Sequence, residues 1–448
     1  MTETATQPLE LLSELIEKAK QNGAEAADAI YMEGRSLSVS WRLGKSEGIE
    51  RAEAAEVGLR ALIGKKQAIA SSTDLSGNAL DELARRVPAM AKSVPEDPYC
   101  GLAELARLAH DIPDLELLDS AEPTPERLME MAAAAEDAAR AVEGITNSEG
   151  AGAGFGASRV AFATSDGFAG EYSGTNYSVS ASVLAGEGTH MERDYDYAQA
   201  CFLEDLEAPE AIGRRAGERA VKRLGSRKVA SQQIPVVYDQ RVAGGLLRHF
   251  ARAINGAAIA RGTSFLKDSL DKPVFAKGIR ITDDPRKLRG LRSRPFDGEG
   301  VATGALDLIE DGRLTSWLLD SRSARQLKLA TKGHAGRGVA GLPAPGVSNL
   351  YLNPGEASPV ELIADIDQGF LVTELIGMGV NGVTGDYSRG AGGFWIEKGE
   401  LTYPVSEVTI AGNLKEMFAR ALPANDLAFR YGIDAPTVRI DGMTLAGA

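Results

Sequence analysis

The sequence has few of the residues that most often bind metals or form cross-links. It contains 2 cysteines, Cys100 and Cys201, among 448 residues. Because the two cysteines have no paired spacing, they form neither a disulfide framework nor a cysteine-type zinc knuckle. No HExxH or HxH pattern occurs. We therefore expect surface or structural roles for the four histidines: His110, His190, His249 and His334.

Long apolar runs and a nucleophile motif are also missing. No stretch approaches the roughly 20 apolar residues that a membrane-spanning helix needs. The opening segment MTETATQPLELL lacks the basic and apolar parts of a signal peptide. These absences predict a cytosolic protein without a membrane segment. The sequence also has no GxSxG elbow, so it does not indicate a serine hydrolase of that kind.

Positive charge is in deficit overall but is locally concentrated. The formal net charge is −14, and this balance argues against a protein that mainly grips phosphate backbones. No aromatic residues are interleaved with the basic clusters to stack bases, so we expect solvated or partner-facing surface and no nucleic-acid partner. The clusters are Arg214, Arg215, Arg219, Lys222, Arg223, Arg227 and Lys228, then Arg286, Lys287, Arg289, Arg292 and Arg294.

The order of periodic segments predicts an α+β protein. Helix-plus-sheet patterns occupy residues 1–105 and 106–230, including a capped helix start at Thr124-Pro125-Glu126. From residue 231 to 448 the pattern changes to short strands around one amphipathic helix, Val242 to Ile254. We predict two N-terminal α+β domains followed by a mostly antiparallel β domain with a buried helix.

The segment from Gly377 to Asn413 is rich in glycine and also carries aromatic residues. Its opening, Gly377 to Gly382, matches GxGxxG after a strand, but no helix follows to receive a pyrophosphate, so nucleotide binding is not indicated. We predict a tight turn cluster with positive φ at Gly385 and Gly392. Polar and glycine residues of this cluster are our candidates for peptide contact: Asp386, Tyr387, Arg389, Gly385 and Gly392. The alternative for Asp386 and Arg389 is an Asx-type turn with a local ion pair.

Several long strings, mostly after Ile234, closely resemble the TldD/PmbA peptidase family. They are GTSFL (262–266), ITDDP (281–285), RPFDGEG (294–300), WLLDSRSARQL (317–327), SNLYLNPG (348–355), VTGDYSRGAGGFWIEKGE (383–400) and PTVRIDGMTLAG (436–447). The resemblance implies one of two kinds of subunit. TldD-like members carry HExxxH on a helix ahead of GTS and a cysteine near the C-terminus as metal ligands. PmbA-like members, also called TldE, resemble a metal-free partner in a dimer that encloses a chamber and cleaves unfolded peptides.

The zinc positions of the family are degenerate in this chain. Arg248 and His249 stand where the TldD-like pattern begins His-Glu, and Ala253 stands where the second histidine falls. Residues 422–426 contain no cysteine. One histidine cannot hold a catalytic ion, so ligand counting predicts no metal and no cofactor. The resemblance therefore implies a PmbA-type subunit whose partner is a TldD-like zinc subunit, with a homodimer when that partner is missing.

Three hypotheses for function remain open at this stage. In the first, this subunit lines the chamber and holds extended, unfolded peptide through a strand edge. The second is a stand-alone peptidase or hydrolase that uses its own carboxylates, whose pairing sequence spacing cannot assign. The third, a modulator of DNA gyrase, is disfavoured by the net charge. The candidate carboxylates are Asp283, Asp284, Asp297, Glu299, Asp386, Glu397 and Glu407.

Overall fold

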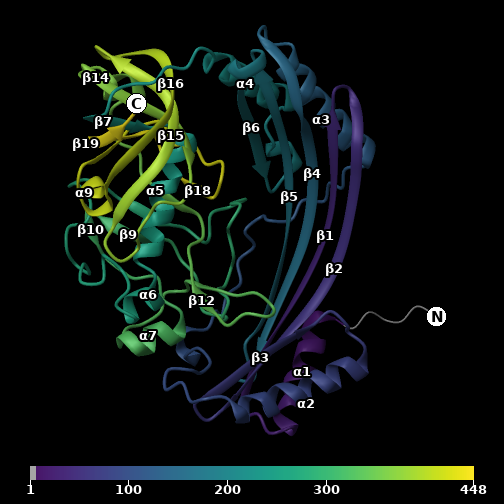
Figure 1. Ribbon diagram of the computed structural model, residues 1–448. Coiled ribbons are helices and arrows are strands. Elements are labelled where there is room, and N and C mark those ends of the chain that lie inside the picture. The colour runs from purple at the N-terminus through teal and green to yellow at the C-terminus, as the bar shows by residue number, and fades with distance from the viewer. Residues whose placement is uncertain (1–6, 448) are drawn as a thin grey trace.

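The computed structural model describes residues 7–447. A curved sheet of very long strands stands on one side of the molecule, and the β-rich C-terminal part stands on the other (Figure 1). The mixed α+β class predicted from the sequence is confirmed.

The long sheet is antiparallel throughout and contains strands from both expected N-terminal domains. Its order is β3-β2-β1-β4-β5-β6, and β1 pairs with β4 from Asp28 to Trp41. The boundary expected near residue 105 therefore divides a single hydrogen-bonded sheet. The strands are β1 (Ala26–Arg42), β2 (Lys45–Ile63), β3 (Lys66–Ser72), β4 (Ile145–Thr164), β5 (Ala169–Ala185) and β6 (Glu192–Ala200).

Two pairs of helices cover separate parts of this sheet. Helices α1 (Pro8–Gln21) and α2 (Gly77–Ser93) pack on one end around Leu12, Leu59 and Leu83. Helices α3 (Pro125–Arg140) and α4 (Pro209–Lys222) pack on the other end around Leu128, Tyr177 and Ile212. The backbones of α3 and α4 lie so close that a Cβ on Gly213 would stand 1.9 Å from the Ala135 carbonyl oxygen. Short 3₁₀ turns occur at Leu105–Arg107, Gly188–His190 and Leu203–Asp205.

Five strands of the C-terminal part close into a ring. The order is β16-β15-β14-β7-β19, and β16 also pairs with β19 while β17 extends from β19. Only β7 and β14 run parallel within this ring. The strands are β7 (Gln232–Tyr238), β14 (Gln368–Ile376), β15 (Asp386–Glu397), β16 (Glu400–Asn413), β17 (Ala421–Pro423) and β19 (Val438–Ala446).

Smaller elements surround the ring. A second sheet has the order β10-β9-β8-β13-β18, and β11 pairs with β12. The strands are β8 (Ile281–Asp283), β9 (Leu306–Glu310), β10 (Arg313–Leu314), β11 (Ala335–Gly336), β12 (Ala344–Pro345), β13 (Leu350–Leu352) and β18 (Ile433–Asp434). The helices are α5 (Gln240–Ala253), α6 (Gly256–Ala260), α7 (Ser321–Leu327), α8 (Pro359–Ile363) and α9 (Leu414–Ala419).

Helix α5 is the predicted buried helix, and one face of it lies in the core. Its buried side chains include Leu246, Leu247 and Phe250, and the ring of Phe250 meets Phe275 edge-on at 5.3 Å. The helix approaches β18 closely, because a Cβ on Gly244 would stand 2.7 Å from the Ile433 carbonyl oxygen. The side chain of Asp239 caps the helix by accepting the Arg241 amide at 2.9 Å.

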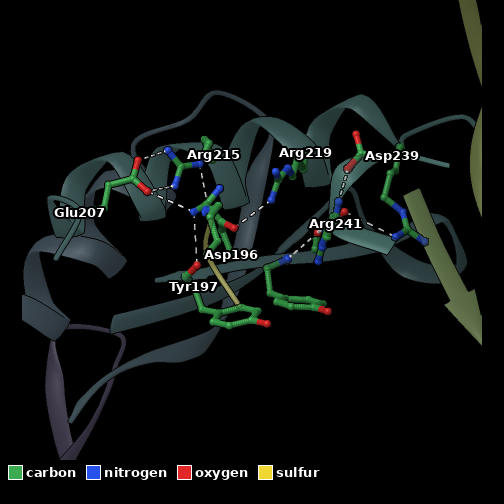
Figure 2. Close-up of polar contacts among 11 residues, drawn as sticks. Asp196, Tyr197, Glu207, Arg215, Arg219, Asp239 and Arg241 are labelled. Carbon is green, nitrogen blue, oxygen red and sulfur yellow. Dashed lines mark hydrogen bonds and ion pairs between the residues drawn. The ribbon is translucent and has the colours of Figure 1, made fainter. Parts of the chain in front are cut away.

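An ion-pair network joins α5 to the long sheet. Figure 2 shows Arg215 and Arg219 of α4 directed toward Asp196 of β6, at 2.7 and 3.0 Å. Two strand positions earlier, Asp194 accepts Arg241 of α5 at 2.6 Å. Arg223 also reaches across, to Glu374 of β14 at 2.6 Å. Much of the first basic cluster is therefore paired with carboxylates inside the molecule.

A second buried contact fixes the other end of the C-terminal part to the long sheet. Asp28 of β1 is fully buried and accepts Arg60 of β2 at 2.9 Å and Arg337 at 2.6 Å. Beside this pair, a Cβ on Gly58 would stand only 1.9 Å from the Val339 carbonyl oxygen, so glycine is required there. Burial by itself would raise the pKa of Asp28. The charges of Arg337 and Arg60 outweigh burial and hold this pKa below its usual value of 3.8.

We expect Asp28→Asn to destabilise the protein by about 3–5 kcal/mol, because both guanidiniums would stay buried and lose their hydrogen-bonded counter-charge. Because the folded-state pKa of Asp28 lies below 3.8, its contribution is complete above that pH and is lost as pH falls through the lowered value. Urea unfolding of wild type and variant measures the effect. The control is Glu53→Gln, which removes an exposed pair with Arg51 and should cost about 1 kcal/mol or less. Equal midpoints for D28N and E53Q would contradict the prediction.

Candidate functional site

The outer face of α5 carries two arginines that form no ion pair with a carboxylate among residues 7–447. Arg248 and Arg252 are exposed and stand four residues apart, so they share one face of the helix. Like charges at this spacing destabilise a helix by a few tenths of a kcal/mol.

These arginines line a cavity of about 570 Å³. Arg292, from the loop between β8 and β9, and Arg389 of β15 complete a set of four, which we call the arginine cavity. No aspartate or glutamate is among its lining residues. Its apolar wall consists of Leu318, Pro345, Val347, Met378 and Ile433.

The two arginines from outside α5 are held by carbonyl oxygens. Arg292 donates to Ser348 at 3.0 Å and to Val347 at 3.3 Å. Arg389 donates through Nε to Ile376 at 3.3 Å. These contacts orient the guanidiniums without cancelling their charge. Burial, with Arg294 and Arg248 nearby, lowers the pKa of Arg292 from its usual value.

His249 lies in this wall beside Tyr387. The two rings meet edge-on, with centroids 5.9 Å apart. Burial, together with Arg389, Arg252 and Arg248, lowers the pKa of His249 to about 4. The imidazole is therefore neutral at physiological pH and can accept or donate a hydrogen bond.

Of the residues predicted from the sequence, the structure brings Arg248, His249 and Arg389 together at the cavity, with Tyr387 against His249. Ala253 is buried instead, and its carbonyl accepts the Ser264 hydroxyl at 2.5 Å. That bond links α5 to the GTS segment.

Asp386 does not pair with Arg389, so the local ion pair weighed for these residues does not form. Its oxygens accept Thr384 Oγ1 at 2.6 Å and Asn413 Nδ2 at 3.1 Å, and these bonds lower its pKa from 3.8. Residues 386 and 389 are an odd number of positions apart on β15, so their side chains leave opposite faces of the strand.

The prediction of positive φ is right for Gly385 and wrong for Gly392. Gly385 has a φ of +88° and is packed against Phe265 and Asn413. Gly392 lies within β15 with ordinary backbone, and a Cβ there would meet nothing closer than 3.6 Å. Gly393 is the position that requires glycine, because a Cβ there would stand 1.8 Å from the Leu371 carbonyl oxygen.

Sequence reasoning missed Arg252 and did not assign Arg292 to a site. The spacing of Arg248 and Arg252 was visible in LLRHFARA and could have indicated a cationic helix face. Arg292 and the apolar wall come from distant segments that only the fold brings together. A further cavity, of about 620 Å³, lies along residues 112–118 and contains none of the predicted site residues.

The residues at the family's zinc positions do not fit a zinc ion. Arg248 and Ala253 offer no metal-ligating side chain, and the surrounding guanidiniums repel a cation. Within residues 7–447, no three His, Cys, Asp or Glu side chains gather as a metal-binding group. Cys100 and Cys201 are buried and free. None of the helices in this range has the length and apolar character needed to cross a bilayer.

Comparisons with known proteins agree with this fold along the whole chain. The PmbA/TldA metallopeptidase family matches in three parts: its domain 1 at residues 27–91, its central domain at 118–224 and its C-terminal domain at 231–447. Metalloprotease PmbA from Escherichia coli O157:H7 is 39% identical over 449 aligned residues, which cover 100% of this chain and 96% of that protein. The chain belongs to the PmbA/TldD metallopeptidase family.

Two crystal structures share the fold. A candidate modulator of DNA gyrase from Bacteroides thetaiotaomicron VPI-5482 superposes with a TM-score of 0.90 at 28% identity, covering 98% of each chain. TldE from Thermococcus kodakarensis superposes with a TM-score of 0.86 at 20% identity, covering 98% of this chain and 100% of that chain. The arrangement of the long sheet and the C-terminal ring is thus common to all three structures.

We predict that Gly393→Ala disrupts folding, because the added Cβ would overlap a backbone oxygen that cannot move without breaking the β14–β15 pairing. The cost should exceed about 2 kcal/mol, as expected for forced strain in a packed strand. The neighbouring Gly392→Ala is the matched control and should melt within a few degrees of wild type. Thermal unfolding measures both variants. A G393A variant as stable as G392A would contradict the close approach.

A second prediction concerns the field inside the arginine cavity. Arg389→Gln should raise the pKa of His249 above about 4, because one of the charges that disfavour the imidazolium is removed. NMR titration of the imidazole signals measures the shift. Since the folded-state pKa lies below 6.5, wild type should lose His249-linked stability as pH falls from 6.5 toward 4, and R389Q should lose less. Arg261→Gln, outside the cavity, is the control. An unchanged His249 pKa in R389Q would contradict the prediction.

Proposed function

We propose that this chain is the metal-free, PmbA/TldE-type subunit of a cytosolic peptidase that degrades or processes unfolded peptides. Its role is to provide chamber wall, peptide contacts and dimer surface to a TldD-like subunit that carries the zinc. The observation that carries the proposal is the arginine cavity, which occupies the helix position where the TldD-like pattern holds its metal.

The cavity also lacks the parts of a hydrolytic site. Cleavage of a peptide bond needs a nucleophile or activated water and a group that accepts its proton. The cavity lining includes no carboxylate, cysteine or serine, and its one histidine is surrounded by positive charge. Arginine stays protonated and cannot act as the base.

The rival, a stand-alone hydrolase, would use the carboxylates of this chain. Asp386 has both oxygens engaged by Thr384 and Asn413 and keeps a low pKa. Asp297 accepts the amides of Glu299, Val301 and Ala335, and Glu299 accepts the Ser321 amide. These buried carboxylates organise loops, and the space that Glu299 lines has a volume of only about 10 Å³. The metalloprotease name belongs to the Escherichia coli relative, and from it we infer a peptide substrate for this chain.

The first experiment is metal analysis. Protein purified without chelator should contain far less than one zinc per chain, because the ligand positions hold Arg248 and Ala253. A TldD-like subunit with HExxxH, purified in the same buffers, is the positive control and should retain its metal. One tightly held zinc per chain in this protein would contradict the proposal.

The second experiment is a peptidase assay of each subunit and of the pair. This chain alone should leave an unfolded peptide intact, whereas the co-purified pair should cleave it and stop on chelation. A pair in which the zinc ligands of the TldD-like subunit are replaced should assemble but remain inactive. Chelator-resistant cleavage by this chain alone would favour the stand-alone hydrolase.

A further inference from the structure

The arginine cavity gathers positive charge that the rest of the molecule leaves unbalanced. The chain carries a formal net charge of −14, and several interior arginines have carboxylate partners. Examples are Arg215 with Asp196, Arg223 with Glu374, and Arg337 with Asp28. The guanidiniums of the cavity have no such partner among the described residues.

Of the four arginines, only Arg252 has a charge that its local structure stabilises. Arg252 lies in the last turn of α5, where the helix dipole favours a cation. Arg248 lies a full turn earlier, and Arg292 and Arg389 come from other segments, so the dipole does not compensate them. Holding four guanidiniums around one space costs free energy that a bound anion would return.

The guanidiniums keep hydrogen-bond donors available for such an anion. Arg389 uses Nε for the Ile376 carbonyl, which leaves both terminal nitrogens free for a two-pronged contact. Arg248 and Arg252 form no side-chain hydrogen bonds within residues 7–447. Planar carboxylates accept this fork geometry well.

Part of the cavity lining is apolar. Met378 is 75% exposed, and Leu318, Val347 and Ile433 continue the apolar surface. A volume of about 570 Å³ exceeds the space of a simple anion and suits one or two amino-acid residues. The last residue of a peptide presents a negative carboxylate next to its side chain, which can be apolar.

We propose that the arginine cavity binds the free C-terminal carboxylate of a peptide whose last side chain is apolar. The inference rests on the proposed function, because it assumes that peptide is the substrate. Binding at this point would anchor one end of an unfolded chain on the metal-free subunit.

The test measures binding of fluorescent peptides to the full chain, without a partner, by anisotropy. The probes are a short unstructured peptide ending in leucine with a free carboxylate, the same peptide with a C-terminal amide, and the amide peptide with one internal glutamate. We expect the free carboxylate to bind about tenfold more tightly than the amide, the difference of one good charge-assisted contact. The internal glutamate should restore little of this affinity.

The variant is Arg248→Gln with Arg252→Gln, two exposed positions at which the fold should tolerate the change. It should lose the preference for the free carboxylate and keep the weak binding of the amide. Arg261→Gln is the matched control, because Arg261 is exposed, close in sequence and outside the cavity lining. Raising the ionic strength should weaken the carboxylate peptide selectively. Circular dichroism melting verifies that the variants are folded.

Each other outcome overturns the inference. Equal affinity for carboxylate and amide, or an unchanged preference in the double variant, removes the carboxylate site. If the internal glutamate restored the full affinity, the cavity would bind side-chain carboxylates and would not select a terminal one. If inorganic phosphate competed more strongly than the carboxylate peptide, the ligand of the cavity would be a phosphate and not a peptide. The proposed function fails separately, by zinc in this chain or by cleavage without a partner.

Discussion

The position of helix α5 depends on one buried ion pair between two parts of the molecule. Asp194 of β6 accepts Arg241 in the first turn of α5 at 2.6 Å, and the carboxylate is almost fully buried. The same arginine lies over the Tyr195 ring at 4.0 Å, so both its charge and its flat face are engaged. Because Asp239 caps the helix at this end, the start of α5 is fixed in direction and in register. Arg248 and Arg252, about two and three turns later, face the cavity as a consequence.

Buried pairs of this kind stabilise a fold less than they specify it. Moving each charge out of water costs several kcal/mol, and the partner charge returns about that much when the geometry is good. Asp194, Asp196 and Asp28 each have at least two arginine contacts, from both sides of the junction. Any other docking of the C-terminal part on the long sheet would leave these charges buried and unpaired. The network thus selects one arrangement among many that would bury similar apolar area.

The sequence predicted local elements well because their signals are local. Thr124 caps α3, because its side chain accepts the Arg127 amide as the Thr-Pro-Glu start predicts. The face of α5 that carries Leu247 and Phe250 is buried, as its periodicity indicates. The pairing of β1 with β4 was not predictable, because paired residues lie from 110 positions apart (Trp41 and Ala151) to 136 positions apart (Asp28 and Thr164), which leaves no local trace. Part of the cavity lining was predictable from the sequence, because Arg248 and His249 stand at motif positions. Arg292 was not, because it lies on a loop that only tertiary packing brings to the cavity.

The arginines of the cavity provide positive charge, as a zinc ion would, but their chemistry differs from that of a metal. The family resemblance implies that TldD-like relatives hold a zinc ion at the corresponding helix, and a catalytic zinc attracts substrate oxygen and activates water. A guanidinium attracts an oxygen by charge and hydrogen bonds, but it coordinates no water and holds its proton at any physiological pH. With Arg248 at a ligand position and Arg252, Arg292 and Arg389 around it, the site offers electrostatic attraction to an anion, and under the proposed function hydrolysis is left to the partner. In the function that we propose, such a subunit would hold peptide without cleaving it, as a chamber wall beside a catalytic partner requires.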